Sequence, residues 1–101
     1  KDGLMEATDI KQLDSFKAGM LFVRAEGIIP APESCHAIAA ACNEAEKCKQ
    51  TGEEKVILFN LSGHGLIDMT AYDQYLSGSL QNYEFTDEDV KENLDKIEKY
   101  V

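Results

Sequence analysis

The chain has 101 residues and a mass of 11.2 kDa, which limits it to one domain with a radius of gyration of about 13 Å if compact. It carries 19 acidic and 10 basic residues, and the resulting net charge of −9 argues against binding to nucleic acids or anionic membranes. No apolar run is long enough for a transmembrane helix, and the start does not have the pattern of a signal peptide. Because the chain begins with Lys1 rather than Met, we expect it to be a piece of a longer protein.

Two helices are predicted in the first half of the chain. Apolar residues recur at steps of three and four over residues 9–24, which is typical of a helix. Thr8 or Asp9 is suited to cap its start and Gly27 to end it. Pro32 suits the first turn of a second helix over residues 33–50, and Thr51-Gly52 is expected to end it. Ile29 stands between them and precedes a proline, so residues 28–29 should be extended.

Three cysteines, Cys35, Cys42 and Cys48, fall on the inner stripe of the second predicted helix. Three thiols cannot all pair within one chain and nothing suggests export, so we expect reduced, buried cysteines in a cytoplasmic protein. Zinc is the alternative, because His36 adjoins Cys35. The cysteine spacings of seven and six match no site with paired ligands, and we therefore predict no metal site.

The segment over residues 56–61, Val-Ile-Leu-Phe-Asn-Leu, is apolar without alternation, as in strands that are buried on both faces of a parallel sheet. An extended segment, a helix and a buried strand in this order predict a right-handed β-α-β crossover. The predicted fold class is therefore α/β, with a small, partly parallel sheet flanked by helices. The turn over residues 62–65 would lie at the carboxyl end of the strand, where open α/β sheets bind ligands.

Two further helices are predicted towards the C-terminus. A short one covers residues 70–76. Thr86 and Asp89 form a capping box, which predicts the start of a last helix. Its apolar residues fall on one side, at Val90, Leu94, Ile97 and Val101.

The chain contains no GxSxG, GxGxxG or Walker motif. Its Gly63-His64-Gly65 sequence is by itself more typical of a turn than of a phosphate-binding loop. From the residues alone, the chain is therefore a small acidic domain with a polar turn at a strand end.

Two longer motifs are more specific. Glu-Gly-Ile-Ile-Pro at residues 26–30 and Asn-Leu-Ser-Gly-His-Gly at residues 60–65 are separated by one helix and one predicted strand. Together they resemble the C-terminal portion of the tryptophan synthase β chain family, within the fold-type-II class of pyridoxal-phosphate enzymes, and are most similar to its divergent second branch. The resemblance covers roughly residues 3–83, and the predicted terminal helix, within residues 84–101, is a weaker match.

The resemblance implies a pyridoxal phosphate site. By it, Ser62 would place its hydroxyl against the pyridine nitrogen of the cofactor, Glu26 would lie near the same end of the ring, and Gly63 would let the backbone pass close by. The parent family joins L-serine and indole to form L-tryptophan by β-replacement. Without the resemblance, the residues alone favour a structural interpretation, in which Glu26 ends a helix and Ser62 caps a turn.

Some features of the family are missing. Ordinary β chains continue the second motif with Arg-Gly-Asp-Lys-Asp, whereas this chain has His-Gly-Leu-Ile-Asp at residues 64–68, which puts coupling to a separate α chain in doubt. Neither histidine precedes a lysine that could form the Schiff base, and there is no run of three glycines for the phosphate. We therefore expect the isolated chain to be inactive and to bind no cofactor alone.

Two hypotheses remain from the sequence. In the first, the chain is the C-terminal fragment of a pyridoxal-phosphate lyase, supplies the wall beside the cofactor ring, and needs the remainder of a β chain that the resemblance implies to be a homodimer. In the second, it is a stand-alone interaction module that has kept the fold and lost the chemistry. A threonine synthase fits the Asn-Leu-Ser-Gly-His-Gly motif poorly.

Overall fold

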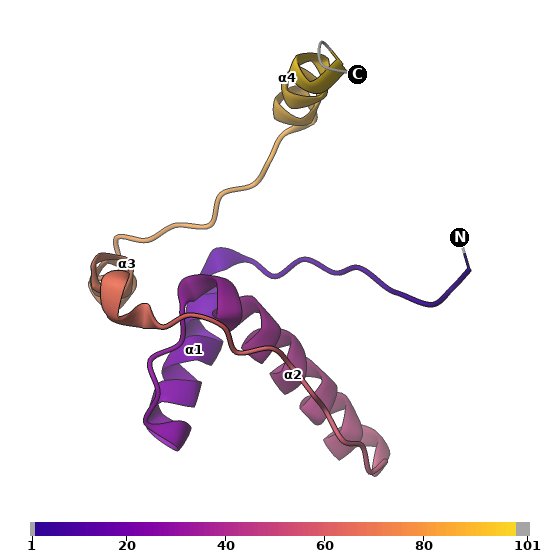
Figure 1. Cartoon of the computed structure of the whole chain (residues 1–101), viewed down its shortest axis with the longest axis vertical. Helices are drawn as coiled ribbons and strands as arrows, with labels where there is room; N and C mark the ends of the chain where they lie inside the picture. Colours follow the sequence, from indigo (N-terminus) through magenta and orange to yellow (C-terminus); the bar gives the residue numbers. More distant parts are fainter. Residues whose placement is uncertain (1, 99–101) are drawn as a thin grey trace.

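The computed structural model describes residues 2–98 and is built from helices (Figure 1). In chain order these are α1 (Gln12–Glu26), α2 (Pro32–Thr51), the short 3-10 helix η1 (Gly65–Ile67), α3 (Met69–Leu76) and α4 (Asp87–Glu98). None of them is long and apolar enough to cross a membrane. Residues 2–98 contain no β-strand, so the prediction of an α/β fold with a β-α-β crossover and a partly parallel sheet is wrong.

The segment predicted as a buried strand, residues 56–61, has no regular secondary structure and runs beside α2 (Figure 1). One row of its side chains is partly covered, with Ile57 and Leu61 37% and 39% exposed. Phe59 packs edge-on against Phe22 of α1 with ring centroids 6.1 Å apart, whereas Val56 and Leu58 are 99% and 95% exposed. The uninterrupted apolar pattern indicated burial on both faces, and the structure provides cover for one face only.

The second predicted strand, residues 28–29, is too short to pair with it. A sheet requires a ladder of backbone hydrogen bonds between neighbouring strands. Here the Ile29 carbonyl accepts one such bond, from the Gly65 N–H at 2.9 Å, and Pro30 follows without an N–H to donate. That bond comes from the turn that follows residues 56–61, so within the described chain the two predicted strands share no backbone hydrogen bond and form no ladder.

Helix α1 begins three residues later than predicted. Its N-cap is Lys11, which makes no side-chain capping bond, so Asp9 has no role in starting the helix. Gly27 ends it as predicted, with a φ of 70° that favours glycine and its N–H donated to the Val23 carbonyl at 2.9 Å.

Helix α2 extends the predicted range by one residue at each end, so this prediction is confirmed. Pro32 takes the first position and Glu33 lies in the first turn, where its charge suits the helix dipole. At the other end, Gly52 adopts a φ of 72° and donates its N–H to the Cys48 carbonyl at 2.8 Å.

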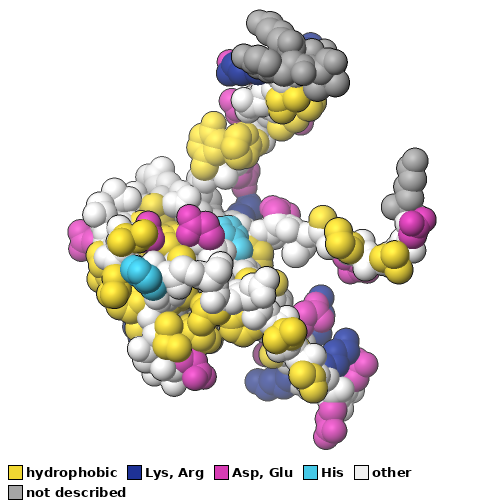
Figure 2. Space-filling view, viewed as in Figure 1, with side chains coloured by type: hydrophobic (Ala, Val, Ile, Leu, Met, Phe, Trp, Pro, Cys, Tyr) yellow, Lys and Arg dark blue, Asp and Glu magenta, His cyan; other side chains and the backbone are white. Residues whose placement is uncertain are grey.

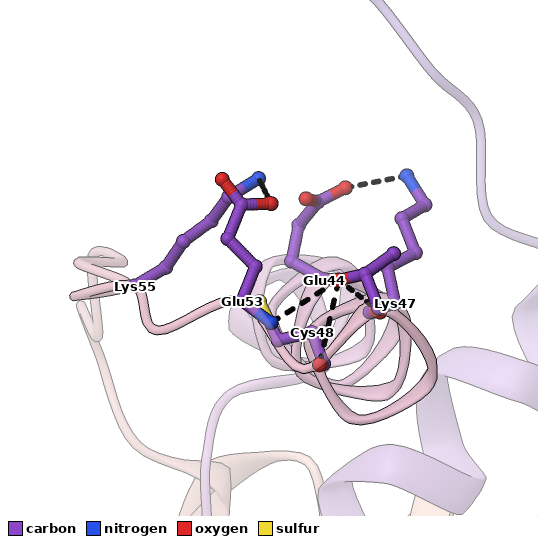
Figure 3. Close-up of polar contacts among 6 residues, drawn as sticks. Glu44, Lys47, Cys48, Glu53 and Lys55 are labelled. Carbon is purple, nitrogen blue, oxygen red and sulfur yellow. Dashed lines mark hydrogen bonds and ion pairs between the residues drawn. The ribbon is translucent and has the colours of Figure 1, made fainter.

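The C-terminal end of α2 carries a group of exposed polar contacts (Figure 3). The Thr51 hydroxyl donates to the Lys47 carbonyl at 3.1 Å, and the Glu53 N–H donates back to that hydroxyl at 3.4 Å. Lys47 pairs with Glu44 at 2.5 Å and Lys55 with Glu53 at 3.4 Å. Exposed ion pairs of this kind contribute little to stability.

Helices α1 and α2 form the body of the molecule, and they approach very closely at one position. Gly19 of α1 faces Cys35 of α2, and a Cβ atom built on Gly19 would lie 2.4 Å from the Cys35 sulfur. Cys35 is fully buried, with Phe16 and Tyr72 in the same cluster. A second cluster joins the same two helices and consists of Ala18, Ile38 and Ala39.

All three cysteines lie on α2 and are free. Cys35 is buried, whereas Cys42 and Cys48 are half-buried, so the predicted burial holds in full for Cys35. His36 adjoins Cys35 but is exposed. Among residues 2–98, no group of three His, Cys, Asp or Glu side chains is placed to hold a metal ion.

The remaining helices start close to their predicted positions. Helix α3 begins at Met69, one residue before the predicted start. The capping box of α4 is present: the Thr86 N–H donates to an Asp89 carboxylate oxygen at 2.9 Å, and the Asp89 N–H donates to the Thr86 hydroxyl at 3.2 Å. Val101, predicted on its apolar side, lies outside the described residues. Helix α4 stands apart from the body (Figure 1), and the radius of gyration is 16.6 Å instead of the 13 Å or so of a compact chain.

Candidate functional site

The candidate site is the turn over residues 62–65, which lies against the N-terminal end of α2. Ser34, in the first turn of α2, is buried and donates its hydroxyl to the Ser62 carbonyl at 2.7 Å. This bond joins residues 28 apart in the sequence. It fixes the backbone of Ser62 and leaves the Ser62 side chain outside the contact.

Position 63 requires a glycine for two reasons, its backbone conformation and the close packing around it. Its φ of +68° is strained for any residue with a side chain, and a Cβ atom there would lie 3.2 Å from the Cβ of Ala31. The turn therefore passes closely over the residue that precedes α2, and a side chain at position 63 would lift it.

Gly65 closes the turn and is buried. Its N–H donates to the Ile29 carbonyl at 2.9 Å. A Cβ atom on Gly65 would lie 2.5 Å from a methyl carbon of Ile29 and 2.6 Å from the carbonyl oxygen of Pro30. The two motifs of the sequence, at residues 26–30 and 60–65, are therefore packed together at this point without a sheet.

A buried tyrosine, Tyr72, packs against this turn and stabilises it. The Tyr72 hydroxyl donates to the Pro30 carbonyl at 2.6 Å and lies 3.4 Å from the Cys35 sulfur. Its ring meets that of Phe16 edge-on, with centroids 5.1 Å apart. Burial, followed by the contact with Cys35, raises the pKa of Tyr72. Burial likewise raises the pKa of Cys35, partly offset by the Tyr72 hydrogen bond. Both groups are protonated at neutral pH, and their role is to hold the loops together.

The structure places the sequence-predicted site residues as follows. Ser62 is exposed, and its hydroxyl makes no hydrogen bond with another described residue. Gly63 lies beside it, in the conformation just given. Glu26 is the exposed last residue of α1, and no hydrogen bond or ion pair joins it to the turn within residues 2–98. The predicted strand end at which the turn over residues 62–65 would lie does not exist among residues 2–98.

Ser34 and Tyr72 were missed as supports of the site. Tyr72 stood within the stretch that resembles the family, but it received no role. Both residues act over long sequence separations, 28 residues for Ser34 and 42 for Tyr72, which leave no periodic pattern. A usable signal for Ser34 was its place in a first turn, where a short hydroxyl side chain is a common donor or acceptor for neighbouring backbone.

No protein-family model matches the chain. It is similar to curated proteins, however. It is 63% identical over 78 residues to the tryptophan synthase beta chain 2 of Aquifex aeolicus, which covers 77% of this chain and 18% of that protein. It is 60% identical over 80 residues to the protein of the same name from Methanosarcina mazei, covering 79% of this chain and 18% of that one. A tryptophan synthase beta chain of Pyrococcus horikoshii is 51% identical over 82 residues, 81% of this chain and 18% of its own length.

The chain thus spans less than a fifth of the length of these relatives. Identity of one half to two thirds over about 80 residues is far above what unrelated sequences share, and the two motifs packed together at Ile29 and Gly65 belong to the stretch that resembles the β chains. On these grounds the chain matches a C-terminal portion of the tryptophan synthase β chains.

Proposed function

We propose that this chain is the C-terminal part of a tryptophan synthase β chain-like enzyme and forms the wall of its pyridoxal phosphate site beside the cofactor ring. The parent reaction would be the joining of L-serine and indole to L-tryptophan by β-replacement. Support comes from the identity with named β chains and from the construction of the turn at residues 62–65.

One observation carries this proposal: Ser62 has a fixed backbone and an unengaged hydroxyl. The Ser34 bond and the close approach of Gly63 to Ala31 hold the turn, while the Ser62 side chain remains exposed. A hydroxyl of this kind fits the pyridine nitrogen of the cofactor, because it can donate one hydrogen bond to an acceptor in the ring plane. The absence of a side chain at Gly63 leaves room for a flat ring next to the backbone.

When bound, pyridoxal phosphate supplies an electron sink for bonds at the α-carbon of the substrate amino acid. Ser62 would orient the ring through its nitrogen. A neutral hydroxyl does not hold a proton on that nitrogen as an aspartate would, which weakens the sink and suits β-elimination and β-replacement. Glu26 is proposed as a second residue near the same end of the ring, with its position set by the rest of the β chain.

The chain is proposed to need that remainder for activity. It has no lysine that follows a histidine and no run of three glycines, so a Schiff-base lysine and a phosphate loop must come from elsewhere. One hydrogen bond from Ser62 contributes about 1 kcal/mol net. Even millimolar affinity requires about 4 kcal/mol, so Ser62 alone does not retain the cofactor.

The experiment is a chimera in which this chain replaces the matching segment of the Aquifex aeolicus β chain. We expect the chimera to form L-tryptophan from L-serine and indole. Ser62→Ala should lower kcat while the cofactor stays bound, because only the contact with the ring nitrogen is lost. Ser79→Ala, at an exposed serine after α3, is the matched control and should leave kcat unchanged.

The hypothesis that the chain is a stand-alone interaction module predicts the opposite result. In that case the chimera would fold and bind pyridoxal phosphate without forming tryptophan, and Ser62→Ala would change nothing. If the chimera is active and Ser62→Ala does not change its kcat, the proposal that the chain is part of such an enzyme stands. The contact proposed between Ser62 and the ring nitrogen is then wrong.

A further inference from the structure

The turn over residues 62–65 is held by a side chain whose own position is fixed. Ser34 lies in the first turn of α2 and is 5% exposed, and its neighbour Cys35 is fully buried. A serine in a first helical turn commonly bonds to backbone nearby in the sequence. Ser34 instead donates its hydroxyl to the Ser62 carbonyl, 28 residues further along, at 2.7 Å. Helix α2 is therefore the well-packed side of this bond, and the exposed turn is the part that is held.

The bond with Ser34 sets the direction of the whole peptide group between Ser62 and Gly63. This peptide is trans, since residues 2–98 contain no cis peptide bond, so its C=O and N–H point in opposite directions. With the carbonyl turned towards α2, the Gly63 N–H is turned away from the helix. Ser62 and Gly63 are both exposed, and the Gly63 N–H makes no hydrogen bond within the described chain. The open side of the turn therefore presents two donors, this N–H and the Ser62 hydroxyl.

The glycine at position 63 makes the opposite peptide direction available. Its φ is +68°, the sign that one orientation of the preceding peptide requires. Rotating a peptide by about half a turn interconverts the two common types of turn and gives the following glycine a negative φ, which glycine adopts as readily. The reversed peptide would place the Ser62 carbonyl oxygen on the open side, where the Gly63 N–H now lies. The Ser34 hydroxyl stabilises the first direction only, because it bonds to the carbonyl on the side of α2.

The turn and the start of α2 share an accessible face of the molecule. Figure 2 shows both histidine side chains of the chain on one face of the body, and of these His36 belongs to α2 and His64 to the turn. Apart from its chain neighbours, Gly63 has one described atom within 4 Å of where a Cβ would lie, the Cβ of Ala31. A flat ring can therefore reach the two donors from the side that faces away from α2.

We propose that Ser34 is a positioning residue of the pyridoxal phosphate site, whose hydroxyl keeps hydrogen-bond donors, and no carbonyl oxygen, on the open side of the turn. This role rests on the proposed function, in which the Ser62 hydroxyl meets the pyridine nitrogen. A pyridine nitrogen without a proton is an acceptor, so donors stabilise this form, whereas a carbonyl oxygen in their place would stabilise the protonated ring. Ser34 thus favours the unprotonated ring, the form suited to β-replacement, from a buried position behind the turn.

The test uses the chimera with the Aquifex aeolicus β chain, loaded with pyridoxal phosphate that carries ¹⁵N in the ring. The ¹⁵N chemical shift of the bound cofactor reports on the bonding of the ring nitrogen. Both Ser62→Ala and Ser34→Ala should move this shift, and Ser34→Ala should lower kcat by about fivefold, the loss expected for one net hydrogen bond, with little change in KM. Ser15→Ala is the matched control and should change neither, because this buried serine in the first turn of α1 donates to the Gln12 carbonyl of its own helix at 2.8 Å.

Two further comparisons separate positioning from general support of the fold. If Ser34 acts through the turn, the shift change of the double variant Ser34→Ala with Ser62→Ala should be well below the sum of the two single changes, whereas independent effects would add. Ser34→Thr and Ser34→Val have the same shape and differ in the hydroxyl, so any crowding of the buried position is common to both. Ser34→Thr should keep the shift of the unmodified chimera, and Ser34→Val should not.

The results also distinguish the role of Ser34 from the proposed function. If Ser62→Ala moves the shift while Ser34→Ala and Ser34→Val do not, the positioning role is wrong and the contact of Ser62 stands. Additive changes in the double variant, or equal behaviour of Ser34→Thr and Ser34→Val, would likewise contradict the positioning role. If Ser62→Ala leaves the shift unchanged, the contact with the ring nitrogen is wrong, and the role of Ser34 is overturned with it.

Discussion

The hydroxyl of Tyr72 lies 2.6 Å from the carbonyl oxygen of Pro30, 42 residues earlier in the chain. Both residues are buried, so this bond joins the loop before α2 to helix α3 in the interior of the molecule. The candidate turn is held between these two elements, because Gly65 is bonded to Ile29 and packed against the Tyr72 ring.

Removing that hydroxyl should therefore destabilise the whole fold. Tyr72→Phe leaves the Pro30 carbonyl buried without its donor, and we expect a loss of about 1–3 kcal/mol in the free energy of unfolding. Urea denaturation measures it. Tyr83→Phe, at a tyrosine that is 68% exposed, is the control and should change stability by less than about 0.5 kcal/mol. Equal effects of the two variants would mean that the buried bond is not a significant support.

A side chain at Gly65 should disturb the packing beside Tyr72. Gly65→Ala brings a methyl group within 2.6 Å of the Pro30 carbonyl oxygen, and we expect a cost of about 1–3 kcal/mol with shifted Tyr72 ring signals in NMR spectra. Gly78→Ala separates crowding from backbone strain, since Gly78 has a φ of +75° and no atom close to where its Cβ would be. That control should lose stability through strain alone and leave the Tyr72 signals in place.

Stability should fall at alkaline pH. Burial raises the pKa of Cys35 above its ordinary value of 9.0, and burial also raises the pKa of Tyr72. Both groups hold their protons more tightly in the folded state, so their contribution is complete below pH 9 and is lost as the pH rises beyond it. Urea midpoints measured from pH 7 to 11 should decline, and Cys35→Ala should reduce the slope of that decline. A slope unchanged by Cys35→Ala would contradict the assignment to this thiol.

Loss of the α4 cap should have a local effect. Thr86→Ala removes the hydroxyl that accepts the Asp89 N–H, and capping residues contribute about 1 kcal/mol. Because α4 stands apart from the body, amide exchange should accelerate within residues 87–98 while the urea midpoint of the core stays the same. Thr8→Ala, at an exposed threonine before α1, should alter neither. A parallel drop in the core midpoint would indicate that α4 is coupled to the body.

The helices were predictable because their signals are local. Gly27 and Gly52 end α1 and α2 at the expected places, and the Thr86–Asp89 box starts α4. The start of α1 was misplaced because Asp9 has the right side chain for a cap, while the chain turns into the helix only at Lys11.

The sheet was not predictable from these 101 residues. An apolar run such as residues 56–61 indicates that the segment can be buried. It does not indicate whether the strand that would pair with it belongs to the same 101 residues. Val56 and Leu58 are exposed because no described element reaches them. The turn at Ser62 was found through its glycines, but its supports, Ser34 and Tyr72, depend on contacts that only the folded chain brings together.

The close approach of Gly19 to Cys35 means that these two positions share the volume of roughly one side chain. Their sizes are therefore coupled: a methyl group gained on α1 can be accommodated if the sulfur is removed from α2. Gly19→Ala combined with Cys35→Ala should consequently recover part of the stability that Gly19→Ala loses alone. The distance between the two helix axes depends on the sum of the two side-chain volumes, and neither residue is required by itself.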